Sequence, residues 1–262
     1  MKKLLFTIAL LVCFSSFGQK TIETKYTPPE GYERTYNNAY SKFLREFPLK
    51  ENNIVKYYDG GEKYNDNIWD AVFDYDIGKK DLHQCADAIL YMRAKYLYTN
   101  GLKDNLNYTF LSGYKANYLD FITHYYLVKG SKVSLALRNN TLVDNIETFN
   151  KWIEKIWMWS NTESIDKYDS FYVEIKDIRP GDFFIESNPG SIGHAINVVD
   201  VAVNKTNNNK IFMLSQSYMP AQETQILINP KNGSVWYSLD EFRDLVTPEW
   251  SFTVTQLKRF NN

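Results

Sequence analysis

Apolar residues follow two different spacings along this chain, and the change falls near residue 170. Before it they recur every three or four positions, as on one face of an α-helix. This spacing predicts helices over residues 37–47, from Asp81 to about residue 100, and over 142–159. We expect Asp81 to cap the second helix, with Gln84 three residues later completing a capping box, so that Cys85 lies in its first turns.

After residue 170 the pattern changes to short apolar runs and period-two alternation, separated by turn signals rich in Pro, Gly and Asn. Predicted strands cover residues 171–175, 182–186, 194–203, 210–217, 224–228 and 251–257. Helices come first and an antiparallel sheet second, which predicts an α+β fold without a repeating βαβ unit. We expect one such domain over 36–262, preceded by an extended N-terminal arm over 19–35 that carries Pro28, Pro29 and Gly31.

Composition narrows the classes of function. The 262 residues are 44% hydrophobic and 23% charged, which is typical of a globular protein and excludes wholesale disorder. A formal net charge of -1 provides no basic field for a nucleic-acid backbone, so we expect no nucleic-acid partner. The chain holds 20 Tyr, 16 Phe and 6 Trp, which favours an aromatic core over a sugar- or peptide-binding surface. On the same ground we expect Trp152, Trp157 and Trp159 to form a core-facing side of their helix.

The first residues are typical of a secretory signal. Two lysines precede a short apolar run and then a small-residue cleavage site, which predicts a signal peptide over 1–18 and a periplasmic or cell-envelope location. The run is too short to be a permanent membrane anchor. Lipid attachment at Cys13 is the alternative, disfavoured because Val12 before it is larger than such sites prefer.

Removal of the signal leaves Cys85 as the only cysteine. In an oxidising compartment a lone thiol must be buried, paired with another chain, or functional. The unpaired amides at a helix start favour an anion, so we expect them to lower the pKa of this thiol. The alternative is that Cys85 is a small apolar side chain facing the core.

A histidine and a glutamine complete a candidate site. His194 starts the predicted strand 194–203, and the next predicted strand, 210–217, ends beside Gln216. In an antiparallel hairpin the end of the second strand lies beside the start of the first, which places Gln216 within a residue or two of His194. A Cys–His pair needs a polar group that holds the imidazole in its working tautomer. The alternatives are a half-buried structural histidine and a glutamine that caps a strand end.

Other chemistries find less support. His83, His124 and Cys85 have no metal-ligand spacing, so we expect no metal and no cofactor. A two-carboxylate glycosidase mechanism has nothing beyond abundant acidic residues in its favour. We expect the following aspartates on turns and solvated helix faces: Asp59, Asp74, Asp76 and Asp87.

The order of these features resembles papain-like enzymes, including NlpC-type cell-wall peptidases. Residues 179–185 (RPGDFFI) look like the Pro-Gly-Asp strand before the NlpC histidine, 193–195 (GHA) match its Gly-His, and 216–218 (QSY) look like papain's Asn-Ser-Trp. The resemblance implies that Cys85 is the nucleophile, His194 the general base and Gln216 the orienting residue. It also implies N-terminal helices packed on a C-terminal antiparallel sheet, with an insertion around 100–170. The chain departs from the family because Ala86 and Asp87 follow the cysteine, and because lysines stand where papain has its oxyanion glutamine.

Nearly the whole mature chain also resembles a family of secreted bacterial domains of unknown function. The likeness rests on residues 81–88 (DLHQCADA), 193–195 (GHA), 216–222 (QSYMPAQ) and 247–250 (TPEW). Together these patterns lead to the hypothesis of an envelope cysteine hydrolase that cleaves an amide or peptide bond in a cell-wall peptide. The alternative is a non-catalytic glycan- or peptide-binding domain on the same scaffold.

Overall fold

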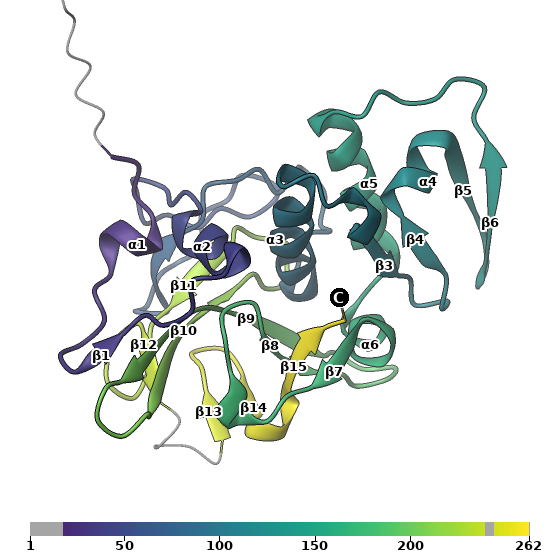
Figure 1. Cartoon of the computed structure of the whole chain (residues 1–262). Coiled ribbons are helices and arrows are strands. Elements are labelled where there is room, and N and C mark those ends of the chain that lie inside the picture. The colour runs from purple at the N-terminus through teal and green to yellow at the C-terminus, as the bar shows by residue number, and fades with distance from the viewer. Residues whose placement is uncertain (1–17, 239–243, 262) are drawn as a thin grey trace, which may run out of the picture.

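The computed structural model describes residues 18–238 and 244–261, and a large antiparallel sheet is its central feature (Figure 1). The sheet consists of β1 (Tyr32–Glu33), β2 (Trp69–Val72), β7 (Ser170–Tyr172), β8 (Phe183–Glu186), β9 (His194–Asn204), β10 (Lys210–Gln216), β11 (Gln225–Leu227), β12 (Trp236–Ser238) and β15 (Leu257–Phe260). These nine strands of the described part follow the order β2-β11-β10-β9-β8-β15-β7, with β1 beside β9 and β12 beside β10. A separate hairpin pairs β13 (Asp244–Val246) with β14 (Ser251–Thr253).

The helices of the first half lie on one side of this sheet (Figure 1). They are α1 (Ile22–Lys25), α2 (Ala39–Glu46) and α3 (Cys85–Thr99). A lobe follows α3 and contains β3 (Asn107–Thr109), β4 (Lys115–Asn117), α4 (Tyr118–Thr123), β5 (His124–Lys129), β6 (Lys132–Leu137), α5 (Ile146–Trp159) and α6 (Thr162–Ser164). Because α3 packs against β9 on one side and α5 on the other, it is buried on nearly all faces of its first ten residues. A helix that is covered all round in this way forms part of the core.

Strands β9 and β10 separate two hydrophobic clusters. Alternate residues of β9, such as Ala195 and Val199, join the helix-side cluster, whereas Ile196 and Val198 join the cluster on the opposite face. Such alternation follows from the period of two in a strand. The pairing shifts by one residue between Met213 and Leu214 of β10, as in a β-bulge. Near-continuous burial of β9 explains why its sequence is apolar at consecutive positions.

The α+β prediction is confirmed, but the order of helices first and sheet second is too simple. Strand β2 comes before α3 and pairs with β11, and β1 comes from the predicted arm and pairs Tyr32 with Asn204. The arm also carries α1, whose Ile22 is fully buried. Residues 19–35 therefore pack on the fold instead of extending away from it. Residues 1–17 of the predicted signal peptide, with Cys13, and the C-terminal residue 262 lie outside the described residues.

Several predicted boundaries are wrong by a few residues. The helix expected over 142–159 begins at Ile146, because Asn145 caps it by accepting a hydrogen bond from the Thr148 amide. The strand expected over 171–175 ends at Tyr172 and is followed by a 3₁₀ turn. The segment expected as one strand over 251–257 is divided by another 3₁₀ turn into β14 and β15.

Candidate active site

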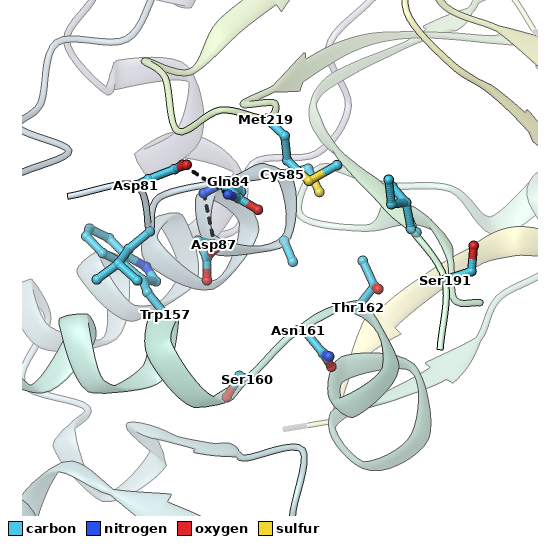
Figure 2. Close-up of a pocket in the computed structure, with 14 residues that line it drawn as sticks. Asp81, Gln84, Cys85, Asp87, Trp157, Ser160, Asn161, Thr162, Ser191 and Met219 are labelled. Atoms are coloured by element: carbon cyan, nitrogen blue, oxygen red, sulfur yellow. Dashed lines mark hydrogen bonds between the residues drawn. The ribbon is translucent and has the colours of Figure 1, made fainter. Parts of the chain in front are cut away.

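Cys85, the predicted nucleophile, lies at the start of α3 and lines a cavity of about 330 Å³, whereas His194 and Gln216 are not among the residues that line it (Figure 2). Helix α3 contributes Cys85 and Asp87 to the wall, the end of α5 contributes Trp157, and the segment before β9 contributes Gly193. The cavity therefore lies between the start of α3, the end of α5 in the lobe and the segment that leads into β9. Its only charged lining groups in the described part of the chain are Asp81 and Asp87.

Cys85 is the first residue of α3, and the N-cap is Gln84, so the expected Asp81 cap is wrong. The Gln84 amide N–H donates to Asp87 Oδ2 at 3.1 Å, which satisfies one of the free donors of the helix start. Asp81 instead accepts hydrogen bonds from the amide of Ala221 at 2.7 Å and from Gln84 Nε2 at 3.1 Å. Its carboxylate fixes the loop before the helix and is not available to cap it.

The Cys85 thiol is almost fully enclosed, with 5% of the residue exposed. The pKa of this thiol is raised to about 11, mainly by burial and to a smaller extent by the carboxyl of Asp87, while the N–H groups of Ala195, Ala86 and Cys85 itself oppose the rise. The expectation of a lowered pKa is therefore wrong, because the cost of desolvating a thiolate exceeds the benefit of the helix amides. The thiol is therefore protonated near pH 7.

The structure brings His194 and Gln216 together as the hairpin predicts. Ser215 pairs with Asn197, one residue before Gln216 along β10, and Gln216 Oε1 lies 2.9 Å from His194 Nε2. The amide orientation is fixed by a second bond, in which Gln216 Nε2 donates to Glu249 Oε2 at 2.6 Å. Because Oε1 can only accept, His194 Nε2 carries the proton and Nδ1 presents the lone pair.

His194 Nδ1 is buried and has no hydrogen-bond partner among the described residues. The imidazole is packed against the rings of Tyr218, Trp250 and Phe252, with centroids 4.8, 5.2 and 5.8 Å away. Burial lowers the pKa of His194 to about 4, with Lys63 adding to the fall and the bond to Gln216 opposing it. The histidine is therefore neutral near pH 7 and has a free basic nitrogen.

Glu249 is a member of this network that the sequence analysis missed. Its carboxylate accepts from Gln216 and also pairs with Lys63 Nζ at 2.7 Å, where the lysine side chain is only 8% exposed. Lys63, Glu249, Gln216 and His194 thus form a continuous chain of polar contacts. The fragment 247–250 was noted only as part of a family likeness, and no spacing rule connects a loop residue to a strand 33 positions earlier.

The other two histidines and Asp87 lie in different surroundings. His83 is fully buried with both ring nitrogens bonded, to Tyr75 Oη at 3.1 Å and to the Gln222 carbonyl at 3.2 Å. His124 lies in the lobe, where Nδ1 contacts the Thr123 hydroxyl. Asp87 was expected on a solvated helix face, but it is 6% exposed because the lobe covers α3. No group of three or more metal-ligating side chains occurs in residues 18–238 and 244–261.

The three tryptophans of α5 were expected to share one environment because they lie on the same helix. The structure places each of them in a different environment. Trp152 is fully buried, Trp157 lines the cavity beside Cys85, and Trp159 is 38% exposed. Only Trp152 is therefore the core residue that the sequence predicted.

Comparison with known proteins assigns the chain to a family. A family model described as a domain of unknown function (4846) matches residues 22–259, so the chain belongs to that family, as the resemblance of its motifs indicated. Neither a curated protein nor a solved structure matches it. In the described part of the chain, none of the helices has the length and apolar character that crossing a bilayer requires.

Proposed function

We propose that this protein is an exported cysteine hydrolase with a papain-like catalytic arrangement, in which Cys85 is the nucleophile, His194 the general base and Gln216 the orienting residue. One observation carries the proposal: His194 Nε2–H donates to Gln216 Oε1, with 2.9 Å between the nitrogen and the oxygen, and the basic Nδ1 is left buried without a partner among the described residues. Buried polar atoms normally have partners, so an orphaned nitrogen needs an explanation. A catalytic base that takes the proton of the Cys85 thiol when substrate is bound provides one.

The position of the sulfur supports this assignment. The backbone N–H of Ala195, the residue after the proposed base, is one of the groups that lower the pKa of the Cys85 thiol. The N–H groups of Cys85 and Ala86 in the first turn of α3 act in the same direction. Backbone donors near the sulfur stabilise negative charge on the thiolate when it forms.

The resting protonation states define the first step. Because burial disfavours both charged forms, the free protein holds a neutral thiol and a neutral imidazole. We propose that substrate binding brings Cys85 Sγ and His194 Nδ1 within hydrogen-bond distance. In unliganded enzymes the distance between two such catalytic groups is often longer than a hydrogen bond. The thiol proton then moves to Nδ1 as the sulfur forms a bond to the substrate carbonyl carbon.

The later steps return every group to its starting state. The tetrahedral intermediate collapses by breaking the carbon–nitrogen bond, and the imidazolium donates its proton to the departing amine. Water then gives a proton to His194 while its oxygen attacks the thioester. The carbon–sulfur bond breaks to release the acid, and the imidazolium returns its proton to the departing sulfur. Gln216 keeps the imidazole oriented throughout, because its own amide is held by Glu249.

The connectivity also supports a papain-like core. A helix that begins at the cysteine is followed in the chain by β8, β9 and β10, which are adjacent and antiparallel, with the histidine at the start of the middle strand. Residues 103–169 form the lobe between the helix and the sheet, at the place where the resemblance implies an insertion. We place the activity in the periplasm or cell envelope on the N-terminal signal pattern, with a cell-wall peptide as substrate.

Digestion of purified peptidoglycan tests the proposal. We expect the wild type to release new amino groups, Cys85→Ala to release none above background, and iodoacetamide to inactivate the wild type in step with alkylation of Cys85. Removing a nucleophile or its base typically costs several orders of magnitude in rate. Equal release by the wild type and Cys85→Ala would contradict the assignment.

A non-catalytic binding domain is the second candidate, and the raised pKa of the buried Cys85 thiol favours it. In that case the wild type and Cys85→Ala bind soluble peptidoglycan fragments equally well, and neither releases amino groups. Binding of the fragments by both proteins in calorimetry, without release of amino groups by the wild type, identifies a binding domain.

A further inference from the structure

The Asp87 carboxyl has two oxygens that can accept hydrogen bonds, and the start of α3 uses only one of them. Its Oδ2 accepts the Gln84 amide at 3.1 Å, which is all that capping requires. Its Oδ1 is buried and has no hydrogen-bond partner among the described residues. Only 6% of the residue is exposed, and burial holds the pKa of the carboxyl well above its usual range. A neutral side chain could cap the helix without this cost, so capping does not explain a carboxyl here.

The unpartnered oxygen belongs to a group that lines the cavity beside Cys85. Figure 2 shows Asp87 on the first turn of α3, with Gln84 and Cys85 on one side and Trp157 and Ser160 on the other. Trp157 Nε1 is a second buried polar atom without a partner in the described part, and this residue also lines the cavity. Two polar groups of one wall are thus left for an occupant.

The acidic residues that line the cavity indicate the charge of the ligand that it can bind. Asp81 and Asp87 are its only charged groups in the described residues, and the remaining lining is neutral. An anion would meet two carboxyl groups, whereas a cation would form a charge-assisted hydrogen bond with Asp87 and favour its ionised form. An ammonium group suits this cavity because it donates in several directions.

We propose that this cavity receives a primary ammonium group of the substrate and that the Asp87 carboxylate is its counter-ion. The inference rests on the proposed function only in assigning the cavity to a substrate. Trp157 then donates to an oxygen of the same ligand. The ammonium group arises either from the amino terminus of a peptide or from the side chain of a diamino acid.

Charged thiol reagents test the proposal without any turnover. We would compare 2-aminoethyl, 2-sulfonatoethyl and methyl methanethiosulfonate, which carry positive, negative and no charge, and assign the modified residue by peptide mapping. In each reaction Cys85 forms a disulfide with the reagent sulfur, the bond between that sulfur and the sulfonyl group breaks, and methanesulfinate leaves. The neutral reagent corrects for changes in thiol reactivity.

We expect the cationic reagent to modify wild-type Cys85 at least about tenfold faster than the anionic one, and Asp87→Asn to reduce this preference by about tenfold. Asp81→Asn is the matched control: it removes the other carboxylate of the same wall and should change the preference by less than about twofold, since that group is exposed and therefore screened. An equal preference in the wild type and Asp87→Asn overturns the proposal, as does faster modification by the anion. Failure of all three reagents also overturns it, because the cavity then does not lead to the sulfur.

Protection experiments identify the source of the amine. L-alaninamide presents a free α-amino group, and Nα-acetyl-L-lysinamide presents only a side-chain amine. Protection of Cys85 from the neutral reagent by one of them supports the proposal and names the source, while protection by neither, together with no charge preference, overturns it. A charge preference without peptidoglycan hydrolysis would refute the catalytic proposal alone, and hydrolysis without a charge preference would refute the ammonium site alone.

Discussion

His83 and His194 are both fully buried, and burial lowers the pKa of each to about 4. They differ in what their ring nitrogens contact. His83 Nδ1 must donate to the Gln222 carbonyl, so its Nε2 accepts from Tyr75, and both nitrogens are satisfied. His194 has the opposite tautomer, with Nε2–H bonded to Gln216 and Nδ1 free in the described part. Burial and a shifted pKa are therefore common to both histidines, and the unsatisfied Nδ1 is what distinguishes His194 from His83.

The largest expected effect is on the rate of peptidoglycan hydrolysis, and it comes from replacing His194 but not His83. His194→Ala should reduce peptidoglycan hydrolysis by about a thousandfold, because the thiol then has no base. His83→Gln should leave the rate per folded molecule within about threefold, because an amide can both donate to Gln222 and accept from Tyr75. His124→Ala, a histidine in the lobe, is the control for histidine removal itself. Equal losses in the His83 and His194 variants would contradict the contrast.

A smaller effect is expected at Glu249, which we regard as a positioning residue. Glu249→Ala frees the Gln216 amide to rotate and should lower kcat by about tenfold to a hundredfold with little change in KM. Glu249→Gln keeps an acceptor oxygen and should retain most of the activity. A purely structural role would leave the tautomer of His194 unchanged, so ¹⁵N chemical shifts of its ring decide the matter: Glu249→Ala should show mixed tautomers.

The pH dependence of stability tests the neutral state of His83. Its folded pKa of about 4 lies below the unfolded value of 6.5, so the unfolded chain binds the proton first as the pH falls. Above pH 6.5 His83 is neutral in both the folded and the unfolded state, and the free energy of unfolding that it contributes is at its full value. Between pH 6.5 and about 4 only the unfolded chain binds the proton, so this contribution is lost. The difference in unfolding free energy between the wild type and His83→Gln should therefore shrink by up to about 3 kcal/mol over this range. Urea titrations at several pH values measure it, and a constant difference would show that His83 is not held neutral.

The smallest expected effect concerns Asp81. Asp81→Ala removes the acceptor for the Ala221 amide and for Gln84 Nε2, and should lower the unfolding free energy by about 1 kcal/mol. Asp81→Asn retains an acceptor oxygen and should cost less. If alanine costs no more than asparagine, the carboxylate does not fix the loop before α3.

Local rules predicted the parts of the site that neighbours in sequence determine. The hairpin register places Gln216 beside His194, and the apolar spacing predicts the helix that presents Cys85. The thiol pKa was predicted in the wrong direction, because the helix start can be read from the sequence but the enclosure of the sulfur cannot. Asp87 was misplaced for the same reason: its helix face is covered by a lobe that begins more than ten residues later.

The fold shows the same division. Long apolar strands such as β9 and β10 were predicted almost to the residue. Of the strands with two to four residues, β8 and β11 were predicted, whereas β1 and β2 were missed. A period of two cannot be recognised over so few positions, and β8 was predicted with the help of the turn signals on either side of it. Strands β1 and β2 exist because partners far along the chain provide their hydrogen bonds.

These distant partners have a consequence for how the protein matures. Strand β1 joins residues 32 and 33 to 204 and 203, and β15, almost the last segment of the chain, lies between β7 and β8. Sheets built from such remote pairings form late and slowly, since long loops must close before the contacts provide any gain. Glu249, which accepts a hydrogen bond from the Gln216 amide, also comes from the residues after β12. A chain that ends before residue 249 contains Cys85, His194 and Gln216 but lacks the carboxylate that holds the Gln216 amide, so we expect it to leave the tautomer of His194 unfixed.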